Sequence, residues 1–557
     1  MKPWPHLNTD TMDDIRVYKG WVLLFQRKKS FYMADDTIKN DEVILARLGY
    51  QQELKRELTS FSNFAISFTI ISILTGVNSL FSFGLRYGGP VVLVWGWTLV
   101  FSFSLMVALS MAEICSAYPT SGGLYFWAAQ LSTPQHAPFW SWLTGWFNLI
   151  GQVATTTGIT FGLATLILNV YTLGNPDFVA VAWHNFVLFV IIMLIIGALN
   201  SFANKVVKIL CDVSVWWHIF GIFIICLAVL IGAPQKRDAG FVFTTFHEDV
   251  TAGLPSPVYT FAIGLLTAQF TFTGYDASAH MSEETQNASL AGPIGIVMSV
   301  VISFFFGLFY IICLLFAMPA DVESVISGGL VVIFDYAVGK TGSILLSVIV
   351  MVAMFFCGMS SLTSNSRMMY AFSRDNALPF SNIWHSINQD TKIPTNSVWL
   401  GVALSIILAV PALLSPTQPL SKGIPIAFSA VTSVSVIGLY ISYVIPVFLR
   451  HTTSSESFVS GPFHLGGFSK VVGWVSILWV FLITIIFVLP TSLPSDANTE
   501  SFTWLSNMNY AGPMVIICVL IFMGWWVVDA RKWFKGPNVV AIDKVVVPAG
   551  STATVNA

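Results

Sequence analysis

The sequence predicts an all-α integral membrane protein with about twelve transmembrane helices, arranged as two inverted repeats of five helices followed by two more. Three observations lead to this fold class. The 557 residues are 55% hydrophobic and only 10% charged, with a mean hydropathy of +0.75. Twelve segments are long and apolar enough to cross a bilayer. The first and sixth segments are interrupted near their middles, which predicts that these two helices are discontinuous.

The composition excludes a soluble globular protein. Soluble domains carry about 25% charged residues, and a surface this apolar would associate in water. The first sixty residues hold no apolar run, so we expect no cleavable signal peptide and expect the first spanning helix to direct insertion. Six cysteines fall in or beside apolar runs without a CxxC pair, which favours small core residues over a disulfide or metal framework: Cys115, Cys211, Cys226, Cys313, Cys357 and Cys518.

The apolar segments divide the chain into regions, since a spanning helix needs roughly 20 apolar residues. We expect a tail that ends in a short interfacial helix (1–60), a ten-helix core (61–450, with repeats 61–232 and 256–449), two further helices (451–532) and a second tail (533–557). The expected helices are 62–84, 90–112, 138–169, 179–199, 207–232, 256–282, 291–318, 330–372, 396–415, 423–449, 470–490 and 510–531.

The basic residues predict the direction in which the chain crosses the membrane. An even number of helices places both tails on one side. With both tails in the cytoplasm, 21 of the 26 Lys and Arg residues lie inside, as the positive-inside rule requires. The Asn287-Ala288-Ser289 glycosylation sequon would then lie in a cytoplasmic loop and stay unmodified.

The interruptions in the first and sixth helices occupy corresponding places in the two repeats. In the first helix, small and polar residues fill positions 75–79, around Gly76. In the sixth, Gly274-Tyr275-Asp276 interrupts an apolar run. We therefore expect both helices to unwind, at residues 75–79 and 271–276, and the two breaks to face each other near the middle of the membrane.

Unwound backbone inside a membrane predicts a binding site, because free N–H and C=O groups need partners there. N–H groups at the start of the second half-helix suit a carboxylate, and carbonyls at the end of the first half-helix suit an ammonium or a cation. A zwitterion fits both. Close packing against a neighbouring helix stays open as the explanation for either glycine taken alone.

The role of each charged residue at or after the second break can be interpreted in two ways. Asp276 is costly inside a membrane, so it either caps the second half of helix 6 or lies at the rim of a substrate site. His280 lies one turn later, as a proton relay or as a packing or capping residue. Glu283, Glu284 and Arg374 are either gating ion pairs or solvated charges near the cytoplasmic surface.

Five stretches, in chain order, carry a resemblance to a known family: "GYQQELKRELTSFSNFAISFTIISILTG", "SMAEICSAYPTSGGLYFWAA", "SWLTGWFN", "FTGYDASAHMSEETQNA" and "SRMMYAFSRDNALPFS". On these stretches the chain resembles the amino acid–polyamine–organocation superfamily. It is most similar to the amino acid/choline transporter group, with its fungal GABA and choline permeases and plant bidirectional amino acid transporters. The resemblance covers residues 49 to about 450. It implies the inverted-repeat fold and secondary active transport by alternating access.

The resemblance also implies a substrate site made by both breaks. The helix 1 segment resembles the family segment whose amides hold a substrate carboxylate. The helix 6 segment resembles the one that holds the amino group and carries an aromatic gate. Gln152 or Asn148 of helix 3 lines the cavity or joins helices by hydrogen bonds. The implied substrate-binding residues are Thr75, Gly76, Val77, Asn78, Ser79, Gln152, Phe272, Gly274, Tyr275 and Asp276.

The coupling ion is left open by one departure from the family pattern. In many relatives a lysine near the middle of helix 5 links transport to protons, and here His218 lies at or near that place. Histidine titrates near neutral pH, so His218 is the expected proton-coupling residue, with Ser360 or Ser361 of helix 8 as neighbours. A structural histidine packed beside two tryptophans is the alternative.

Other functional classes find little support. The sequence lacks HExxH, GxSxG and Cys/His clusters of metal-ligand spacing, so we expect no enzyme, no cofactor, no metal and no nucleic acid partner. The expected partners are a small-molecule substrate, a coupling proton and the lipid bilayer. GABA or a related amino acid is the first choice of substrate, with choline or a polyamine as alternatives. A nutrient receptor on a transporter fold is the alternative of another class. The membrane is the plasma membrane or that of the vacuole or Golgi.

Overall fold

The computed structural model describes residues 38–537 apart from 203, 248–251, 415–425 and 495–507. Within these residues, eleven helical segments are long and apolar enough to cross a membrane, and they match eleven of the twelve expected. They are α2 (Ser60–Ile71) with α3 (Ile73–Arg86), α4 (Gly89–Val91) with η1 (Val92–Gly96) and α5 (Trp97–Ala117), α7 (Ala137–Gly174), α8 (Ala182–Phe202), α9 (Asn204–Gly232), α14 (Ala288–Phe316), α16 (Leu330–Arg374), α18 (Thr395–Ala409) with η4 (Val410–Leu414), α19 (Ile426–Thr452), η6 (Gly466–Phe468) with α20 (Ser469–Ile486), and α22 (Ala511–Val528).

The remaining expected helix, residues 256–282, is interrupted as predicted. It consists of α11 (Pro257–Gly264), α12 (Leu266–Thr271) and α13 (Ala277–His280). The five residues Phe272–Asp276 leave the helix, and Gly274 adopts a φ of 84°. Glycine reaches this left-handed region without the steric cost that a Cβ brings. The predicted break at 271–276 is confirmed, with Thr271 still helical.

The break in the first helix lies at Ser72, so the predicted unwinding of residues 75–79 is wrong. Ser72 has a φ of 35° and separates α2 from α3. Its carbonyl oxygen accepts from the N–H groups of Thr75 and Gly76, both at 2.9 Å, so α3 begins at once. Gly76 serves close packing instead, because a Cβ there would come within 2.2 Å of Oγ1 of Thr271.

The two breaks face each other, as the sequence predicts. A Cβ added to Gly274 would lie 2.3 Å from Cγ2 of Ile70, two residues before the break in the first helix. The Ser67 hydroxyl donates to the carbonyl oxygen of Tyr275 at 3.0 Å and accepts from the N–H of Ser278 at 2.9 Å. Side chains of α2 therefore satisfy backbone groups that the break in helix 6 leaves free.

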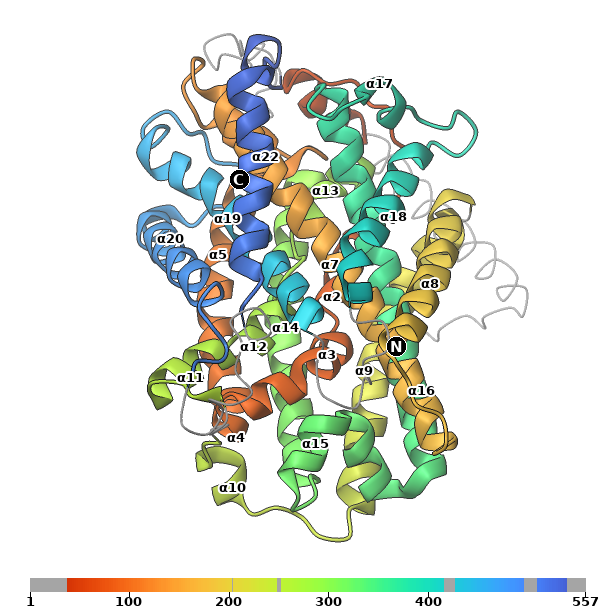
Figure 1. The fold of residues 1–557 in the computed structure, drawn as a ribbon. Coiled ribbons are helices and arrows are strands. Elements are labelled where there is room, and N and C mark those ends of the chain that lie inside the picture. Colours follow the sequence, from red (N-terminus) through yellow and green to blue (C-terminus); the bar gives the residue numbers. More distant parts are fainter. Residues whose placement is uncertain (1–37, 203, 248–251, 415–425, 495–507, 538–557) are drawn as a thin grey trace, which may run out of the picture.

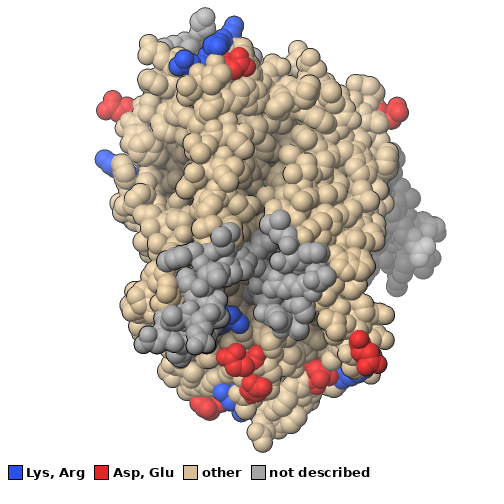
Figure 2. All heavy atoms as spheres, viewed as in Figure 1, with Lys and Arg blue, Asp and Glu red and all other residues tan. Residues whose placement is uncertain are grey.

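Figure 1 shows the helices running between two ends of the molecule. At one end lie α10 (Ala239–Thr244) and α15 (Val322–Gly328), and at the opposite end lies α17 (Ser381–Trp384). These are called the α15 end and the α17 end below. On the visible face in Figure 2, charged side chains gather toward both ends, and the band between them is almost entirely uncharged. Such a band is what a bilayer requires of a surface.

Long helices surround the two breaks. α7 extends over 38 residues and packs against α16, whose 45 residues are interrupted by a kink at Gly339, where φ is 68°. α19 packs on α7. Before the first span, residues 38–47 are helical, and their interfacial position stays a prediction. Leu58 then pairs with Thr285 in a parallel β-bridge. The other short helices are α6 (Gly123–Gln130), η3 (Ser282–Glu284) and η7 (Ala530–Lys532).

Candidate functional site

The break in helix 6 is held by two tyrosines of α19. The hydroxyl of Tyr440 donates to the carbonyl oxygen of Phe272, and the N–H of Gly274 donates to the hydroxyl of Tyr443 at 3.1 Å. Tyr275 lies beside both rings, with centroids 6.3 Å from that of Tyr440 and 5.0 Å from that of Tyr443. The unwound backbone therefore lies within a cluster of three buried tyrosines.

Asp276 lies at the centre of a buried hydrogen-bond network. Its Oδ2 accepts from the side-chain amides of Asn148 at 3.1 Å and Gln152 at 2.8 Å, both on α7. Its Oδ1 accepts from the hydroxyl of Tyr443 at 2.7 Å. His280 Nε2 lies 3.2 Å from Oδ2. All of these side chains are at most 2% exposed, so the carboxylate has no contact with solvent. Its hydrogen-bond partners come from α7, α13 and α19, which belong to the third, sixth and tenth expected helices.

The capping interpretation of Asp276 is wrong. Asp276 is the N-cap residue of α13, but its side chain accepts no hydrogen bond from the backbone of that helix. Its backbone carbonyl oxygen alone bonds to the N–H groups of Ala279 at 2.9 Å and His280 at 3.1 Å. The carboxylate instead joins the second half of helix 6 to α7 and α19, where burial of a charge needs such donors.

A second buried histidine lies at the break of the first helix. His218 of α9 places Nε2 2.7 Å from the Ser72 hydroxyl and Nδ1 2.7 Å from the carbonyl oxygen of Ser214. The expected neighbours in helix 8 are wrong, because the hydroxyl of Ser360 bonds to Cys211 at 3.3 Å and that of Ser361 to α7. Cys211 lies seven residues, about two turns of α9, before His218, and the His218 ring turns toward helix 1.

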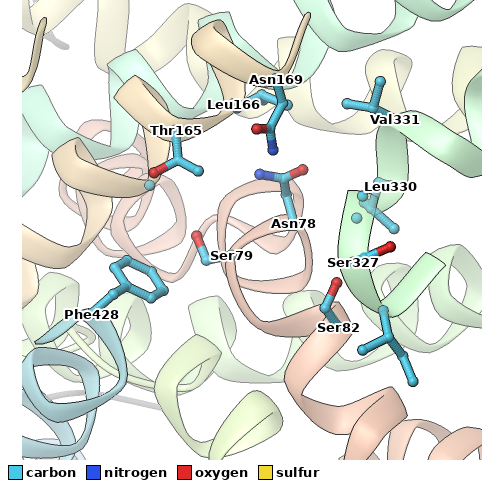
Figure 3. Close-up of a pocket in the computed structure, with 14 residues that line it drawn as sticks. Asn78, Ser79, Ser82, Thr165, Leu166, Asn169, Ser327, Leu330, Val331 and Phe428 are labelled. Carbon is cyan, nitrogen blue, oxygen red and sulfur yellow. The ribbon is translucent and has the colours of Figure 1, made fainter. Parts of the chain in front are cut away.

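Two cavities lie toward opposite ends of the molecule, and the residues that line them flank the breaks along the chain. At the α15 end, a cavity of about 80 Å³ lies between α3, α7 and α15. Figure 3 shows Asn78 and Asn169 pointing toward one another across it, with Ser79 and Phe428 to one side. At the α17 end, a cavity of about 490 Å³ is lined by residues that include Ile66, Cys211, Met281, Glu284 and Arg367.

Buried ion pairs close the α17 end beneath the break in helix 6. Glu283 binds both terminal nitrogens of Arg374 at 3.1 Å, and Glu284 binds Nε of Arg367 at 2.8 Å. The Glu283 side chain is fully buried and that of Arg374 is 12% exposed. These residues form ion pairs within the structure, so the solvated-charge reading is wrong. Burial raises the pKa of the adjacent Asp375 carboxyl, against the lowering effect of Arg374.

The segment before the first span adds a second closure at this end. Arg56 donates to the carbonyl oxygens of Ser282, at 2.9 Å, and Thr285. Its guanidinium lies 3.8 Å from Asp41, whose carboxylate accepts from the N–H of Asn287 at 2.7 Å. Burial raises the pKa of Asp41 and lowers that of Arg56. The chain before helix 1 is thereby fastened to the chain after helix 6.

Comparison with known proteins identifies the family. Residues 58–541 match the protein family described as "Amino acid permease". The chain is 44% identical to "Amino-acid permease BAT1" of Arabidopsis thaliana, over 89% of this chain and 96% of that protein. It is 43% identical to the rice homologue of BAT1, over 88% and 94%. It is 31% identical to "Uncharacterized amino-acid permease C584.13" of Schizosaccharomyces pombe, over 92% of each chain. The chain belongs to the amino acid permease family.

Membership establishes the broad function of this permease. It is a multi-pass membrane protein and an amino acid transporter, not an enzyme. The resemblance drawn from the five sequence stretches is thus confirmed. The two plant proteins have the highest sequence identities of the three relatives named above.

The structure distributes the predicted site residues of the permease over several places. Gln152 and Asp276 meet directly, and His218 lies at the break in helix 1. Phe272 packs on Trp97 of α5, with centroids 4.7 Å apart, and Tyr275 joins the tyrosine cluster. The others lie in α3 or at the helix 6 break: Thr75, Gly76 and Val77 are buried, Asn78 and Ser79 line the α15-end cavity, and Gly274 packs on α2.

Sequence reasoning missed Ser72, Tyr440 and Tyr443. The two tyrosines stand three residues apart in "YISY", a spacing that places both hydroxyls on one face of a spanning helix. That pair of polar rings in the middle of an apolar helix was a usable signal. Ser72 offered none, because "IISIL" reads as uninterrupted helix.

Proposed function

We propose that this permease is a secondary active transporter for GABA or a related amino acid, which works by alternating access and is coupled to protons. The observation that carries the proposal is the meeting of two helix breaks, at Ser72 and at Phe272–Asp276, between cavities at opposite ends. Alternating access requires such a site, reached from each end in turn.

The ends of the broken helices suit a zwitterion. α3 begins at Ile73, and the Ser72 carbonyl oxygen already accepts from the N–H groups of Thr75 and Gly76, so the N–H groups of Ile73 and Leu74 are the ones that suit a carboxylate. Carbonyl groups at the end of α12 suit an ammonium group, and Asp276 supplies the nearest buried carboxylate. We place the substrate carboxylate at the start of α3, near Thr75, and the amino group beside Phe272, Gly274 and Tyr275.

We propose His218 as a proton-coupling residue. Its Nε2 accepts from the Ser72 hydroxyl when the ring is neutral and donates to the same hydroxyl when the ring is protonated. A change of charge on α9 would therefore reverse a hydrogen bond at the break of helix 1. Such a change of charge would be driven by a proton gradient across a plasma, vacuolar or Golgi membrane.

Uptake by the purified permease in sealed vesicles tests the proposal. Radiolabelled GABA should accumulate when the pH differs across the membrane, and accumulation should stop when an ionophore removes the difference. Competition of other amino acids, choline and spermidine with labelled GABA ranks the substrate classes. If choline or spermidine competed most strongly, that compound would replace GABA as the proposed substrate. Specific binding without any uptake would favour the nutrient receptor.

The orientation is part of the same proposal. We place both termini and the α17 end in the cytoplasm, in line with the distribution of Lys and Arg. Asn287 then faces the cytoplasm and carries no glycan. Mass spectrometry of the permease from eukaryotic cells checks this, since a glycan on Asn287 would invert the orientation.

A further inference from the structure

We infer that Asp276 and His280 together form a proton-binding site, which holds one proton while the α17 end of the permease is closed. The inference rests on the proposed proton-coupled transport and names a group besides His218 that binds the transported proton. Both side chains are fully buried, and they lie four residues apart on the second half of helix 6.

The hydrogen-bonding capacity of the His280 ring decides its protonation. Nδ1 lies 3.0 Å from the carbonyl oxygen of Ser121, which can only accept, so Nδ1 carries a proton. Nε2 lies 3.2 Å from Oδ2 of Asp276, and this contact also needs a proton, on one atom or the other. The pair therefore holds one proton more than a neutral histidine beside an ionised aspartate.

The partners of Asp276 favour the imidazolium–carboxylate form of this proton. The amides of Asn148 and Gln152 can only donate to Oδ2. The hydroxyl of Tyr443 accepts from a backbone N–H and donates to Oδ1. Three donors besides His280 stabilise an ionised carboxylate, which in turn stabilises a cationic ring beside it.

Other titratable groups surround the pair on each packed element. The titratable groups that follow the pair along helix 6 and those at the ends of α16 and α6 form ion pairs and hydrogen bonds with one another. The tyrosines of α19 face Asp276. Among the described residues these groups are Glu283, Arg374, Asp375, Tyr125, Tyr275, Tyr440, Tyr443 and, on α5, Cys115. Glu283 and Arg374 compensate each other, so on helix 6 the Asp276–His280 pair is a site where one added proton changes the hydrogen bonding.

Ser121 links this proton to the closure of the α17 end. Its carbonyl oxygen accepts from His280, and its N–H donates to the Glu283 carboxylate at 3.0 Å. A movement that separates Ser121 from helix 6 breaks both contacts together and lets water reach the ring. Water then accepts from the ring N–H groups in place of Asp276 and the Ser121 carbonyl oxygen. The proton then passes from Nε2 to water at the α17 end, and water at the α15 end supplies the next one.

The test compares His280→Gln with His385→Gln in sealed vesicles. Gln keeps a donor toward Asp276 but binds no proton, and His385 is a partly buried histidine remote from both breaks, bonded to the Ser381 carbonyl oxygen at 2.7 Å. Wild type and His385→Gln should accumulate substrate about tenfold for each unit of pH difference, as one proton per substrate allows. His280→Gln should exchange labelled for unlabelled substrate and reach an accumulation ratio of one. His280→Asn, which keeps the Ser121 contact, replaces it if the Gln variant does not fold.

The outcomes separate this inference from the proposed function. Failure of the wild type to accumulate substrate would overturn proton coupling itself. Wild-type accumulation by a folded His280→Gln variant would overturn only the proton site. A second measurement needs no transport: the ¹⁵N spectrum of histidine-labelled permease at pH 7.5 should contain an imidazolium signal that His280→Gln removes. A spectrum in which that substitution removes only a neutral histidine would also overturn the site.

Discussion

Each broken helix of this permease is held by a buried histidine, and the two histidines are bound differently. Both rings place Nδ1 on a backbone carbonyl oxygen, that of Ser214 for His218 and that of Ser121 for His280. At the first break, Nε2 meets the hydroxyl of Ser72, which serves a neutral ring equally well. At the second, Nε2 meets the carboxylate of Asp276. The Ser72 hydroxyl can bond to either a neutral or a protonated His218 ring. The Asp276 carboxylate can bond to His280 Nε2 only if a proton lies between the two atoms.

The difference extends to the α17 end. The second half of helix 6 continues into the ion pairs of Glu283 and Glu284, while the first turn of α2 has only the Thr59 cap and one hydrogen bond from the Ser62 hydroxyl to the Asp212 carboxylate. Electrostatic contacts therefore hold the helix that carries the proposed proton. The following predictions test whether the two breaks divide their roles in this way.

The largest effect is expected from Glu283→Gln. Removing one partner of a buried ion pair costs about 3–5 kcal/mol, because the other charge stays buried. The α17 end should open more often, and a maleimide added from that side should label Cys211, which lines the cavity there, at least tenfold faster. Glu323→Gln is the matched control, since Glu323 pairs with His247 at the surface of the α15 end and should change labelling little. Equal labelling in both variants would exclude a gating role for Glu283.

Asp276→Asn should have the next largest effect. The amide keeps the volume of the side chain and removes the charge. A lost interaction with a substrate ammonium would cost about 1.5–3 kcal/mol, or ten- to a hundredfold in affinity for exchange at fixed pH. Asp212→Asn, at a carboxylate that accepts from the Ser62 hydroxyl at 3.2 Å, is the matched control. Unchanged affinity with less folded protein would make Asp276 structural.

Helix 6 could be predicted from the sequence because its break depends on local chemistry. Gly274 supplies the positive φ, and an aspartate follows it in an apolar run. The break in helix 1 could not be predicted, because a glycine such as Gly76 gives the same sequence signal whether it unwinds a helix or lets another helix approach. Here it meets Thr271, a contact fixed by the tertiary structure. The actual break uses a serine, whose left-handed conformation leaves no trace in composition.

The candidate site shows the same limit. The sequence placed Gln152 and Asp276 in one substrate site, which stays a prediction, and the two side chains do form a hydrogen bond, because polar groups in a membrane pair with one another. The partners of His218 were misjudged, because a histidine on α9 can turn toward helix 1 or helix 8 and the periodicity of α9 alone does not fix which. Ser121 lies in a loop 159 residues from His280, so only the folded chain reveals their contact.

His218→Gln tests the first break by itself. The proposed coupling predicts that exchange of substrate persists while accumulation driven by a pH difference falls toward a ratio of one. The loss is at most about 1.4 kcal/mol for each pH unit, the work available from one proton. His385→Gln again serves as the control. Accumulation with the pH dependence of the wild type would make His218 a packing residue and leave Asp276 and His280 as the only proton site proposed.

Ser72→Ala and Ser72→Gly should have the smallest effects and separate two roles of one residue. Both substitutions remove the hydroxyl that bonds His218 Nε2, at a cost of about 0.5–1.5 kcal/mol. Alanine retains a Cβ at a φ of 35°, whereas glycine adopts this conformation without strain. Thermal unfolding in detergent should therefore show Ser72→Gly to be more stable than Ser72→Ala. The pH dependence of exchange should instead change equally in both, because both leave His218 Nε2 without its partner. If only Ser72→Ala altered that dependence, the shape of the break would govern coupling, and the hydrogen bond to His218 would be incidental.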